Sequence, residues 1–209
     1  MEAKMSGTFM AFEGIDGSGK TTLAAIVSQA LREKGLDVEV IRTKTDAQEV
    51  DFQRFVDGFG LASNSLAYMF LFQAMHARKW ELVRDARSAG KIVIADRWNY
   101  SFYVYHNCFG PLKDLPDETK HLLDLLAFHG MRPDLLFFVE IDPGTAIMRR
   151  KRRGDEIPDP NTEELYYSTV ANEYRRLVGI DRGIILDGNR DWRDLTNEVL
   201  DTVQSHLLL

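Results

Sequence analysis

An eight-residue run near the start of the chain, Gly14 to Thr21, restricts the possible folds more than any other feature. It reads Gly-Ile-Asp-Gly-Ser-Gly-Lys-Thr, which is the Gly-x-x-x-x-Gly-Lys-Thr spacing of a phosphate-binding loop. A short apolar stretch at residues 8–12 precedes it as a buried strand would, and a helix is predicted after it, to about Lys34. In this context, backbone N–H groups and the helix N-terminus point at phosphate oxygens. The alternative, a glycine-rich turn with a chance lysine, does not explain the strand and helix around it.

The rest of the chain alternates strands and helices. Apolar runs bounded by glycine or proline predict further strands at residues 38–41, 92–95, 135–139 and 183–186. Helices are predicted at residues 61–89, 116–129, 145–153, 163–178 and 191–207. Strands this apolar are buried on both faces, which indicates a parallel sheet covered by helices in an α/β fold.

Composition excludes several classes of protein. The 209 residues fit one domain, or a domain with a lid, and the net charge of −6 argues against a surface that coats nucleic acid. The single cysteine, Cys108, excludes a disulfide framework and a multi-cysteine metal site. The sequence has no apolar run of the roughly 20 residues that a membrane span needs, and residues 1–5 lack the apolar core of a signal peptide. We therefore expect a cytoplasmic protein with neither nucleic acid nor a membrane as partner.

Polar and charged residues follow every predicted strand. Ligands of parallel sheets bind at the carboxyl ends of the strands, so these residues mark the expected site. Cations and carboxylates are what phosphoryl transfer needs, because catalysis there is positioning and charge neutralisation. Besides the glycine loop, the set comprises Arg42, Lys44, Asp96, Arg97, Asp142, the run Arg149–Arg153, and Asp187.

Several of these segments together resemble the thymidylate kinase family. The opening Phe12–Thr22 is similar to that of the family, and Asp96-Arg97-Trp98 with Ser101 and Tyr105 resembles its Asp-Arg-Tyr-x-x-Ser-x-x-x-Tyr signature. The similarity spans nearly the whole chain and includes Leu71-Phe72, Pro133-Asp134, Asp142-Pro143, Arg149, Val170, Tyr174 and Ile185–Gly188. It implies a three-layer P-loop NTPase fold over residues 1–209, with sheet order 2-3-1-4-5 and an arginine-rich lid at about 149–161. It also implies a homodimer packed through helices.

The resemblance implies that the chain binds ATP and Mg²⁺ and phosphorylates dTMP to dTDP. The ATP-binding residues would be Gly14, Ile15, Asp16, Gly17, Ser18, Gly19, Lys20, Thr21, Thr22, Arg149 and Asp187. Thr21 and Asp96 would hold the metal. The catalytic residues would be Lys20, Asp96, Arg97, Arg149 and Arg153. Because position 17 is glycine rather than the arginine of one subgroup, the transition-state cation would come from the lid.

The acceptor nucleotide would be bound by Asp16, Arg42, Phe72, His76, Arg97, Ser101 and Tyr105. Phe72 would stack on the base, Arg97 would hold the phosphate, and Tyr105 would pack against the sugar. Three departures concern this side. Of the family's Arg-Glu-Pro-Gly-Gly-Thr only Arg42 is kept; His76 stands where an arginine is expected, with Arg78 two residues on; and Phe102 replaces a small or polar residue.

Other interpretations are open on the sequence alone. The chain could be a related P-loop kinase that acts on another nucleotide or on a nucleoside, or a P-loop regulatory ATPase. The arginine run could be a solvated helix end, and Asp96-Arg97 could be a structural ion pair. Phe72 could belong to the core, and the aromatic residues 98–105 could form an interface.

Overall fold

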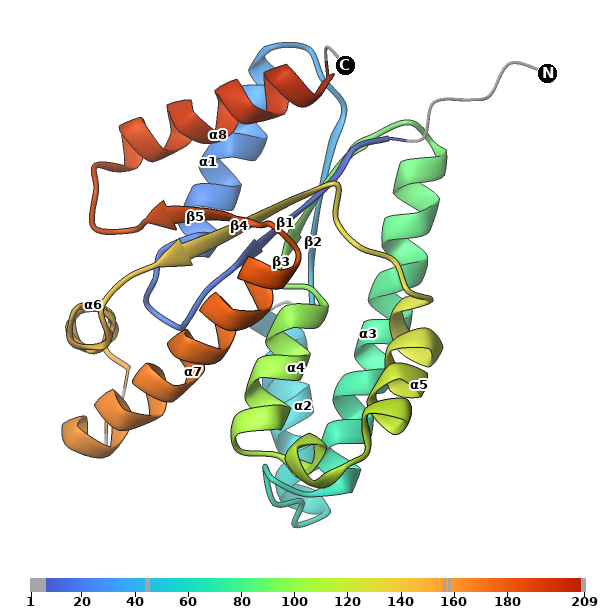
Figure 1. Cartoon of the computed structure of the whole chain (residues 1–209), viewed down its shortest axis with the longest axis vertical. Helices are drawn as coiled ribbons and strands as arrows, with labels where there is room; N and C mark the ends of the chain where they lie inside the picture. Colours follow the sequence, from blue (N-terminus) through green and yellow to red (C-terminus); the bar gives the residue numbers. More distant parts are fainter. Residues whose placement is uncertain (1–6, 44–45, 156, 158, 208–209) are drawn as a thin grey trace.

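A computed structural model describes residues 7–43, 46–155, 157 and 159–207 of the chain (Figure 1). The described residues form a parallel five-stranded sheet in the order β2-β3-β1-β4-β5. The strands are β1 (Phe9–Glu13), β2 (Val38–Arg42), β3 (Ile92–Asp96), β4 (Leu135–Glu140) and β5 (Ile184–Asp187). All five strands, their parallel direction and their order are as predicted.

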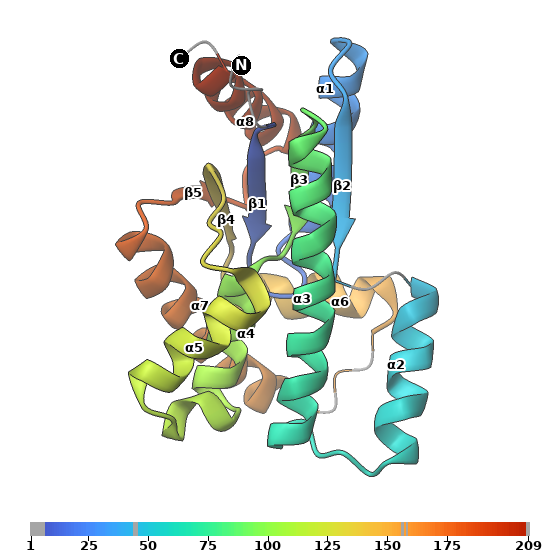
Figure 2. The ribbon, with the colours of Figure 1, turned by 90° about the vertical axis from the view of Figure 1, so that its right-hand side faces the viewer.

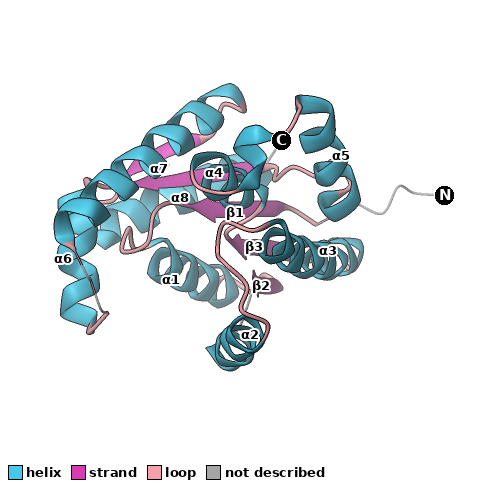
Figure 3. Ribbon diagram, turned by 90° about the horizontal axis from the view of Figure 1, so that it is seen from below, coloured by secondary structure: helices cyan, strands magenta, loops and turns pink. Residues whose placement is uncertain are grey.

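Helices cover both faces of this sheet, which makes the three predicted layers (Figure 3). Helices α1 (Lys20–Glu33) and α8 (Trp192–Leu207) pack together on one face. The other face carries α3 (Leu66–Ser88), α4 (Asn99–Cys108) and α7 (Pro160–Ile180), and α5 (Asp117–Phe128) packs against α3. Two further helices lie beyond the carboxyl ends of the strands: α2 (Asp46–Gly58), which follows β2, and α6 (Pro143–Arg153), which follows β4.

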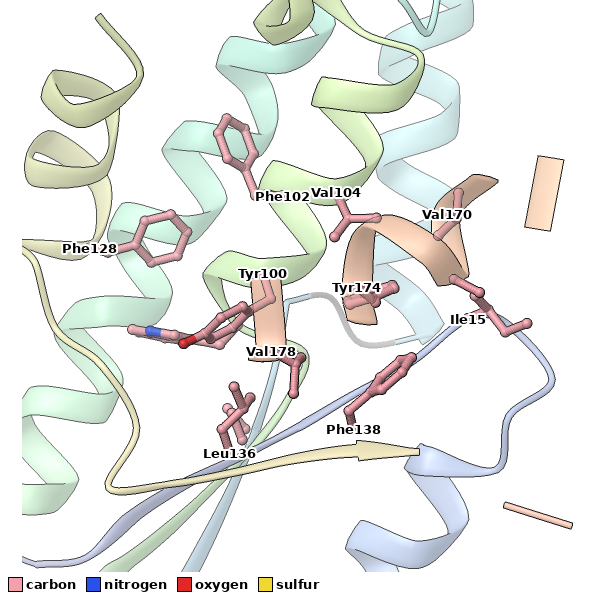
Figure 4. Close-up of a cluster of buried hydrophobic side chains, with 14 of the residues drawn as sticks. Ile15, Tyr100, Phe102, Val104, Phe128, Leu136, Phe138, Val170, Tyr174 and Val178 are labelled. Atoms are coloured by element: carbon pink, nitrogen blue, oxygen red, sulfur yellow. The ribbon is translucent and has the colours of Figure 1, made fainter. Parts of the chain in front are cut away.

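The two faces of the sheet bury two separate apolar clusters. One joins α1 and α8 to side chains such as Phe12 and Val139. The larger one joins α3, α4, α5 and α7 to the opposite face, and Figure 4 shows part of it. There the ring of Tyr174 on α7 stacks on Phe138 of β4 with 5.3 Å between centroids. This cluster fixes α4 and α7 against the sheet. Both helices also supply polar groups near the carboxyl ends of the strands, such as the hydroxyls of Ser101 and Tyr174.

Two helices were not predicted. Helix α4 has the sequence Asn-Tyr-Ser-Phe-Tyr-Val-Tyr-His-Asn-Cys, which is rich in aromatic residues of modest helix propensity, so tertiary packing decides its conformation. Helix α2 follows β2 in a segment for which no element was predicted. The long predicted helix at 61–89 starts only at Leu66, because Ser65 caps it by accepting a hydrogen bond from the Tyr68 N–H at 3.2 Å.

The strands end at one edge of the sheet, above α4 and α6 (Figure 2). The described part of the predicted lid, which spans about 149–161, lies beside this edge (Figure 2). Residues 149–153 are the last turns of α6, which stops at the left-handed Gly154, and α7 already begins at Pro160. The extent of the lid stays a prediction. Among the described residues, none of the helices combines the length and the apolar character that crossing a bilayer requires.

Candidate active site

The glycine loop leads from β1 into α1, as predicted. Backbone conformation and close packing explain why glycine is needed in it. Gly17 has φ of 87°, in the left-handed region, and a Cβ there would lie 2.6 Å from the Ala146 carbonyl oxygen of α6. A side chain at position 17, arginine included, is excluded in this conformation. Gly19 is the N-cap of α1 and provides no capping side chain. The first N–H groups of α1 are thus offered to a bound anion.

Lys20 is buried at the start of α1, with 6% of its surface exposed. Its ammonium donates to the Ile15 carbonyl at 3.4 Å and lies 3.6 Å from Asp16 Oδ1. Burial, together with the charge of Arg97, lowers the pKa of Lys20 to about 8 against the opposite pull of Asp16. A cation with so few partners in a desolvated position is suited to take up an anion.

Thr21 and Asp96 meet at the predicted metal position. The Thr21 hydroxyl donates to Asp96 Oδ2 at 2.7 Å, although the two residues are 75 positions apart. Arg42, at the end of β2, has its Nε 3.9 Å from the same oxygen. Arg42 is therefore beside Asp96 and is not among the side chains that line the neighbouring pocket. Its predicted contact with an acceptor nucleotide stays a prediction.

Arg97 follows β3 and is the centre of the cleft. Its guanidinium donates to the Gly14 carbonyl, the Ser101 hydroxyl and the Tyr174 hydroxyl, each at 3.0 Å. It also forms an ion pair with Asp16, and it lies over the ring of Tyr105 at 5.6 Å from the centroid. Its backbone φ is 67°, a left-handed conformation that residues other than glycine rarely adopt. The turn after β3 is thus specialised to aim this side chain.

A buried carboxylate holds the start of α4 in place. Glu13 ends β1, is fully buried, and accepts hydrogen bonds from the Trp98 N–H at 2.7 Å and from the Ser101 hydroxyl. Burial raises the pKa of Glu13, against the charge of Arg97 and the hydrogen bonds from Ser101 and Trp98. The Ser101 hydroxyl therefore donates to Glu13, which positions it, while its oxygen accepts a hydrogen bond from Arg97.

A pocket of about 480 Å³ opens beside Arg97. Its wall comes from α3, α4, α7 and the segments next to them. It includes every predicted acceptor residue except Arg42, which is six of the seven. The lining side chains are mostly aromatic: Tyr68, Phe72, His76, Phe102, Tyr105, His106, Phe109 and Tyr166, joined by Asp16, Thr43, Glu49, Ser63, Arg97 and Ser101. Tyr105 presents a buried hydroxyl without a hydrogen-bond partner among the described residues.

The inner end of this pocket is apolar and neutral. His76 is 2% exposed and packs against Phe128 and Phe102, with ring centroids 4.9 Å and 5.6 Å away. Burial, with the charges of Lys79 and His106, holds the pKa of His76 well below its usual value. Its Nδ1 has no hydrogen-bond partner among the described residues. Arg78 is exposed and paired with Glu81 at 2.6 Å, so it does not substitute for His76.

Arg149 and Arg153, both predicted in the lid, are placed differently. Arg149 donates to the Ser18 carbonyl at 3.2 Å and to the Gly188 carbonyl at 3.0 Å, so it joins the glycine loop to the loop after β5. Asp187 shapes that second loop by accepting from the Asn189 N–H at 3.0 Å. Arg153 is 64% exposed and paired with Asp155. Its predicted catalytic role stays a prediction.

Several residues of the cleft were not predicted as site residues, among them Glu13, Lys79 and Tyr166. Glu13 could have been noticed as the one acid in an otherwise apolar strand, and Lys79 as a charge on the helix face that also carries His76. For Tyr166 no local pattern separates a pocket residue from the core.

Comparison with known proteins identifies the family. The thymidylate kinase profile matches residues 12–199. The chain belongs to the thymidylate kinase family. It is 31% identical to the thymidylate kinase of Caldanaerobacter subterraneus, with 97% of this chain and 98% of the relative covered. It is 34% identical to the thymidylate kinase of Ruegeria pomeroyi, over the same shares. A probable thymidylate kinase of Methanococcoides burtonii is 29% identical over 96% of this chain and 98% of its own length.

Proposed function

We propose that this thymidylate kinase family member transfers the γ-phosphoryl group of ATP to dTMP, giving ADP and dTDP. One observation carries the proposal beyond family membership: Lys20 and Arg97 both contact Asp16 Oδ1, the lysine at 3.6 Å. One cation belongs to the glycine loop and the other faces the aromatic pocket. Two phosphate-binding cations thus converge on a single point, as a transfer between two phosphates requires.

On the ATP side, the loop supplies backbone N–H groups and Lys20 supplies a fixed charge near the transferred group. Arg149 bridges the two loops between which we place the nucleotide, through Ser18 and Gly188. In this structure Asp16 is the shared partner of both cations. An incoming phosphate would replace this carboxylate as the partner of Lys20 and Arg97, since both anions accept charge-assisted hydrogen bonds.

The residues at the end of β3 fit a magnesium ion. Mg²⁺ prefers oxygen ligands and keeps several waters, so one hydroxyl and one carboxylate are an adequate protein contribution beside nucleotide phosphates. Thr21 and Asp96 present such a pair, 2.7 Å apart. When bound, the ion would neutralise charge on the phosphates during transfer. Asp96 also lies near Arg42, which tempers its charge.

On the acceptor side, Arg97 would hold the phosphate of dTMP with a planar fork of donors. Phe72 lies in the pocket wall within an aromatic group, its ring centroid 5.1 Å from that of Tyr68 and 6.0 Å from that of His106. The base would pack against this ring, and Tyr105 would limit the space beside the sugar. We infer that the main role of Ser101 is to position Arg97 through their hydrogen bond, and that any contact of Ser101 with the nucleotide is secondary.

A different acceptor is the second candidate, and the neutral inner end of the pocket favours it. A typical family member has an arginine at the position of His76, whereas here a neutral imidazole and the ring of Phe102 form the wall. Both departures reduce the number of donors that read a base. Kinase activity with relaxed base selectivity is the expected result.

An ADP-release assay with Mg·ATP tests the proposal against a panel of dTMP, dUMP, dCMP, dGMP and the corresponding nucleosides. Turnover that depends on dTMP supports the proposed function. Turnover only with another acceptor supports the second candidate, a kinase for a different acceptor. ATP hydrolysis that no acceptor stimulates would point instead to a regulatory ATPase. Omission of Mg²⁺ should abolish turnover in the first two cases.

We further propose a homodimer that packs through α3 and α5. These adjacent helices expose large apolar side chains at Leu66, Phe70, Leu82, Leu122, Leu125 and Leu126, with Leu126 63% exposed. Such a group on neighbouring helices suits a second copy of the chain. Light scattering should give twice 23.9 kDa, and Leu126→Glu should give a monomer. A wild-type monomer at micromolar concentration contradicts the proposal.

A further inference from the structure

We infer that Lys79 is a positioning residue for Arg97, whose buried ammonium fixes the backbone turn from which Arg97 enters the cleft. The geometric part of this inference stands on the structure of the turn. Its consequence for catalysis rests on the proposed function, in which Arg97 holds the acceptor phosphate.

Lys79 lies in the middle of α3 and is 2% exposed. Its Nζ donates to the Asp96 carbonyl at 2.9 Å, to the Arg97 carbonyl at 2.5 Å and to the Thr43 hydroxyl at 3.3 Å. An ammonium group has three donors, and all three are used. One side chain thereby joins α3, the end of β3 and the segment after β2.

These bonds act on the unusual part of the turn. Arg97 has φ of 67°, and its own N–H donates to the Phe12 carbonyl at 2.9 Å. The next N–H, that of Trp98, donates to Glu13 at 2.7 Å. Strand β1 therefore holds the N–H groups of the turn, and Lys79 holds its carbonyls. Without the ammonium, the two carbonyls would be left in a buried region without these donors, and the left-handed conformation would lose its support.

The charge of Lys79 also fits its surroundings. Its neighbours in the cleft are the carboxylates of Asp96 and Glu13 and the guanidinium of Arg97. Burial lowers the pKa of Lys79 to about 8, against the attraction of Asp96 and Glu13. Protein structures rarely bury a lysine this completely without partners, and here the partners are the backbone of two predicted site residues.

The closing experiment combines kinetics with a measurement that needs no turnover. Lys79→Met keeps the aliphatic stem and removes the donors, and Lys79→Gln keeps two N–H donors without the charge. Lys91→Met is the matched control, because Lys91 precedes the other end of β3 and pairs on the surface side with Glu39 at 3.0 Å. Hydrogen exchange of the peptide over residues 95–101 should be faster in Lys79→Met and unchanged in Lys91→Met.

In the kinetic arm, kcat/KM for dTMP should fall about 10- to 100-fold in Lys79→Met, the scale that a small misplacement of a binding group produces. The KM for ATP should change less than about twofold, and Lys79→Gln should be intermediate. If Lys79 acts through Arg97, Lys79→Met should cost little more when Arg97→Ala is already present, whereas a general structural role would give additive losses.

The outcomes separate the two proposals. Additive losses, or unchanged exchange together with normal acceptor kinetics, overturn the role of Lys79. If the wild type turns over no acceptor, the proposed function fails, and the exchange of residues 95–101 still decides whether Lys79 holds the turn. If Lys79→Met does not fold, Lys79→Gln decides both arms on the same criteria.

Discussion

The two halves of the cleft are built differently. The ATP half is mostly local: loop, lysine and threonine come from one short stretch at the end of β1 and the start of α1. Arg149 and the loop after β5 complete it. The acceptor half is assembled from α3, α4, α7 and the ends of β1 and β3, so that Arg97 contacts Gly14, Ser101 and Tyr174 at once. A local site depends on backbone conformation, whereas an assembled one depends on packing. In this chain the first agrees with the family pattern, and the second departs from it after Arg42, at His76 and at Phe102.

The largest expected effect is in the ATP half. Lys20→Ala should lower kcat about 100-fold or more, because losing a fixed cation at the transferred group costs roughly 3 kcal/mol of barrier. The protein should stay folded, since burial already disfavours the Lys20 charge. ADP release under saturating dTMP measures the effect. Lys34→Ala, just past the other end of α1, is the matched control. Activity within a few-fold of wild type would disprove the assignment of the loop.

Arg97→Ala tests the acceptor half and should lower kcat/KM for dTMP about 30-fold, in keeping with the loss of a charged contact worth roughly 2 kcal/mol. The KM for dTMP should rise and the KM for ATP should hardly change. If ATP binding collapses while acceptor kinetics hold, the two halves are assigned the wrong way round.

Arg97→Gly is the companion variant, since glycine adopts a φ of 67° without a steric penalty. It should be more stable than Arg97→Ala by about 1 kcal/mol, measured by chemical denaturation, and equally poor in binding dTMP. Equal stability of the two variants would show that the turn is not strained.

The same contrast explains how far the sequence could be interpreted. The strands, their order and the loop were predictable because apolar runs and glycine spacing are local signals. Helix α4 was missed because its aromatic residues become helical only against α7 and the sheet. The surroundings of His76 were beyond prediction for a similar reason: the ring of Phe128, from α5, packs against His76 only in the folded chain. The catalytic role of Arg153 stays a prediction, because in this structure the residue pairs locally with Asp155.

Acid should destabilise the fold through His106, which lines the acceptor pocket. Burial lowers the pKa of His106 to about 4 in the folded protein, against 6.5 when exposed. Between these values the unfolded chain binds a proton that the native state does not, so stability is full above pH 6.5 and falls as the pH drops toward 4. The loss from pH 7 to 4.5 should be on the order of 2 kcal/mol for this group.

Urea denaturation of the wild type and of His106→Gln at both pH values measures this dependence. The variant should lose less stability than the wild type on acidification, because its amide does not titrate. His121→Gln, on the exposed face of α5, is the control and should behave as the wild type. An identical pH dependence in wild type and His106→Gln would place the acid sensitivity in other groups.

The smallest expected effect concerns base selectivity, where the acceptor half departs most from the family. His76 is neutral at pH 7 and offers one donor at most, whereas the arginine it replaces would present a charged fork. His76→Arg should therefore raise the preference for dTMP over dCMP up to about tenfold, within the 1–3 kcal/mol of a bidentate base contact. Values of kcat/KM for dTMP, dUMP, dCMP and dGMP in both proteins give the ratio, with His121→Arg as control.

The melting temperature is needed as well, because the new guanidinium would lie one helical turn from the buried Lys79 ammonium. If the wild type already uses dTMP alone and a folded His76→Arg gains nothing, the base is read elsewhere in the pocket. The assembled half would then be as constrained as the local one.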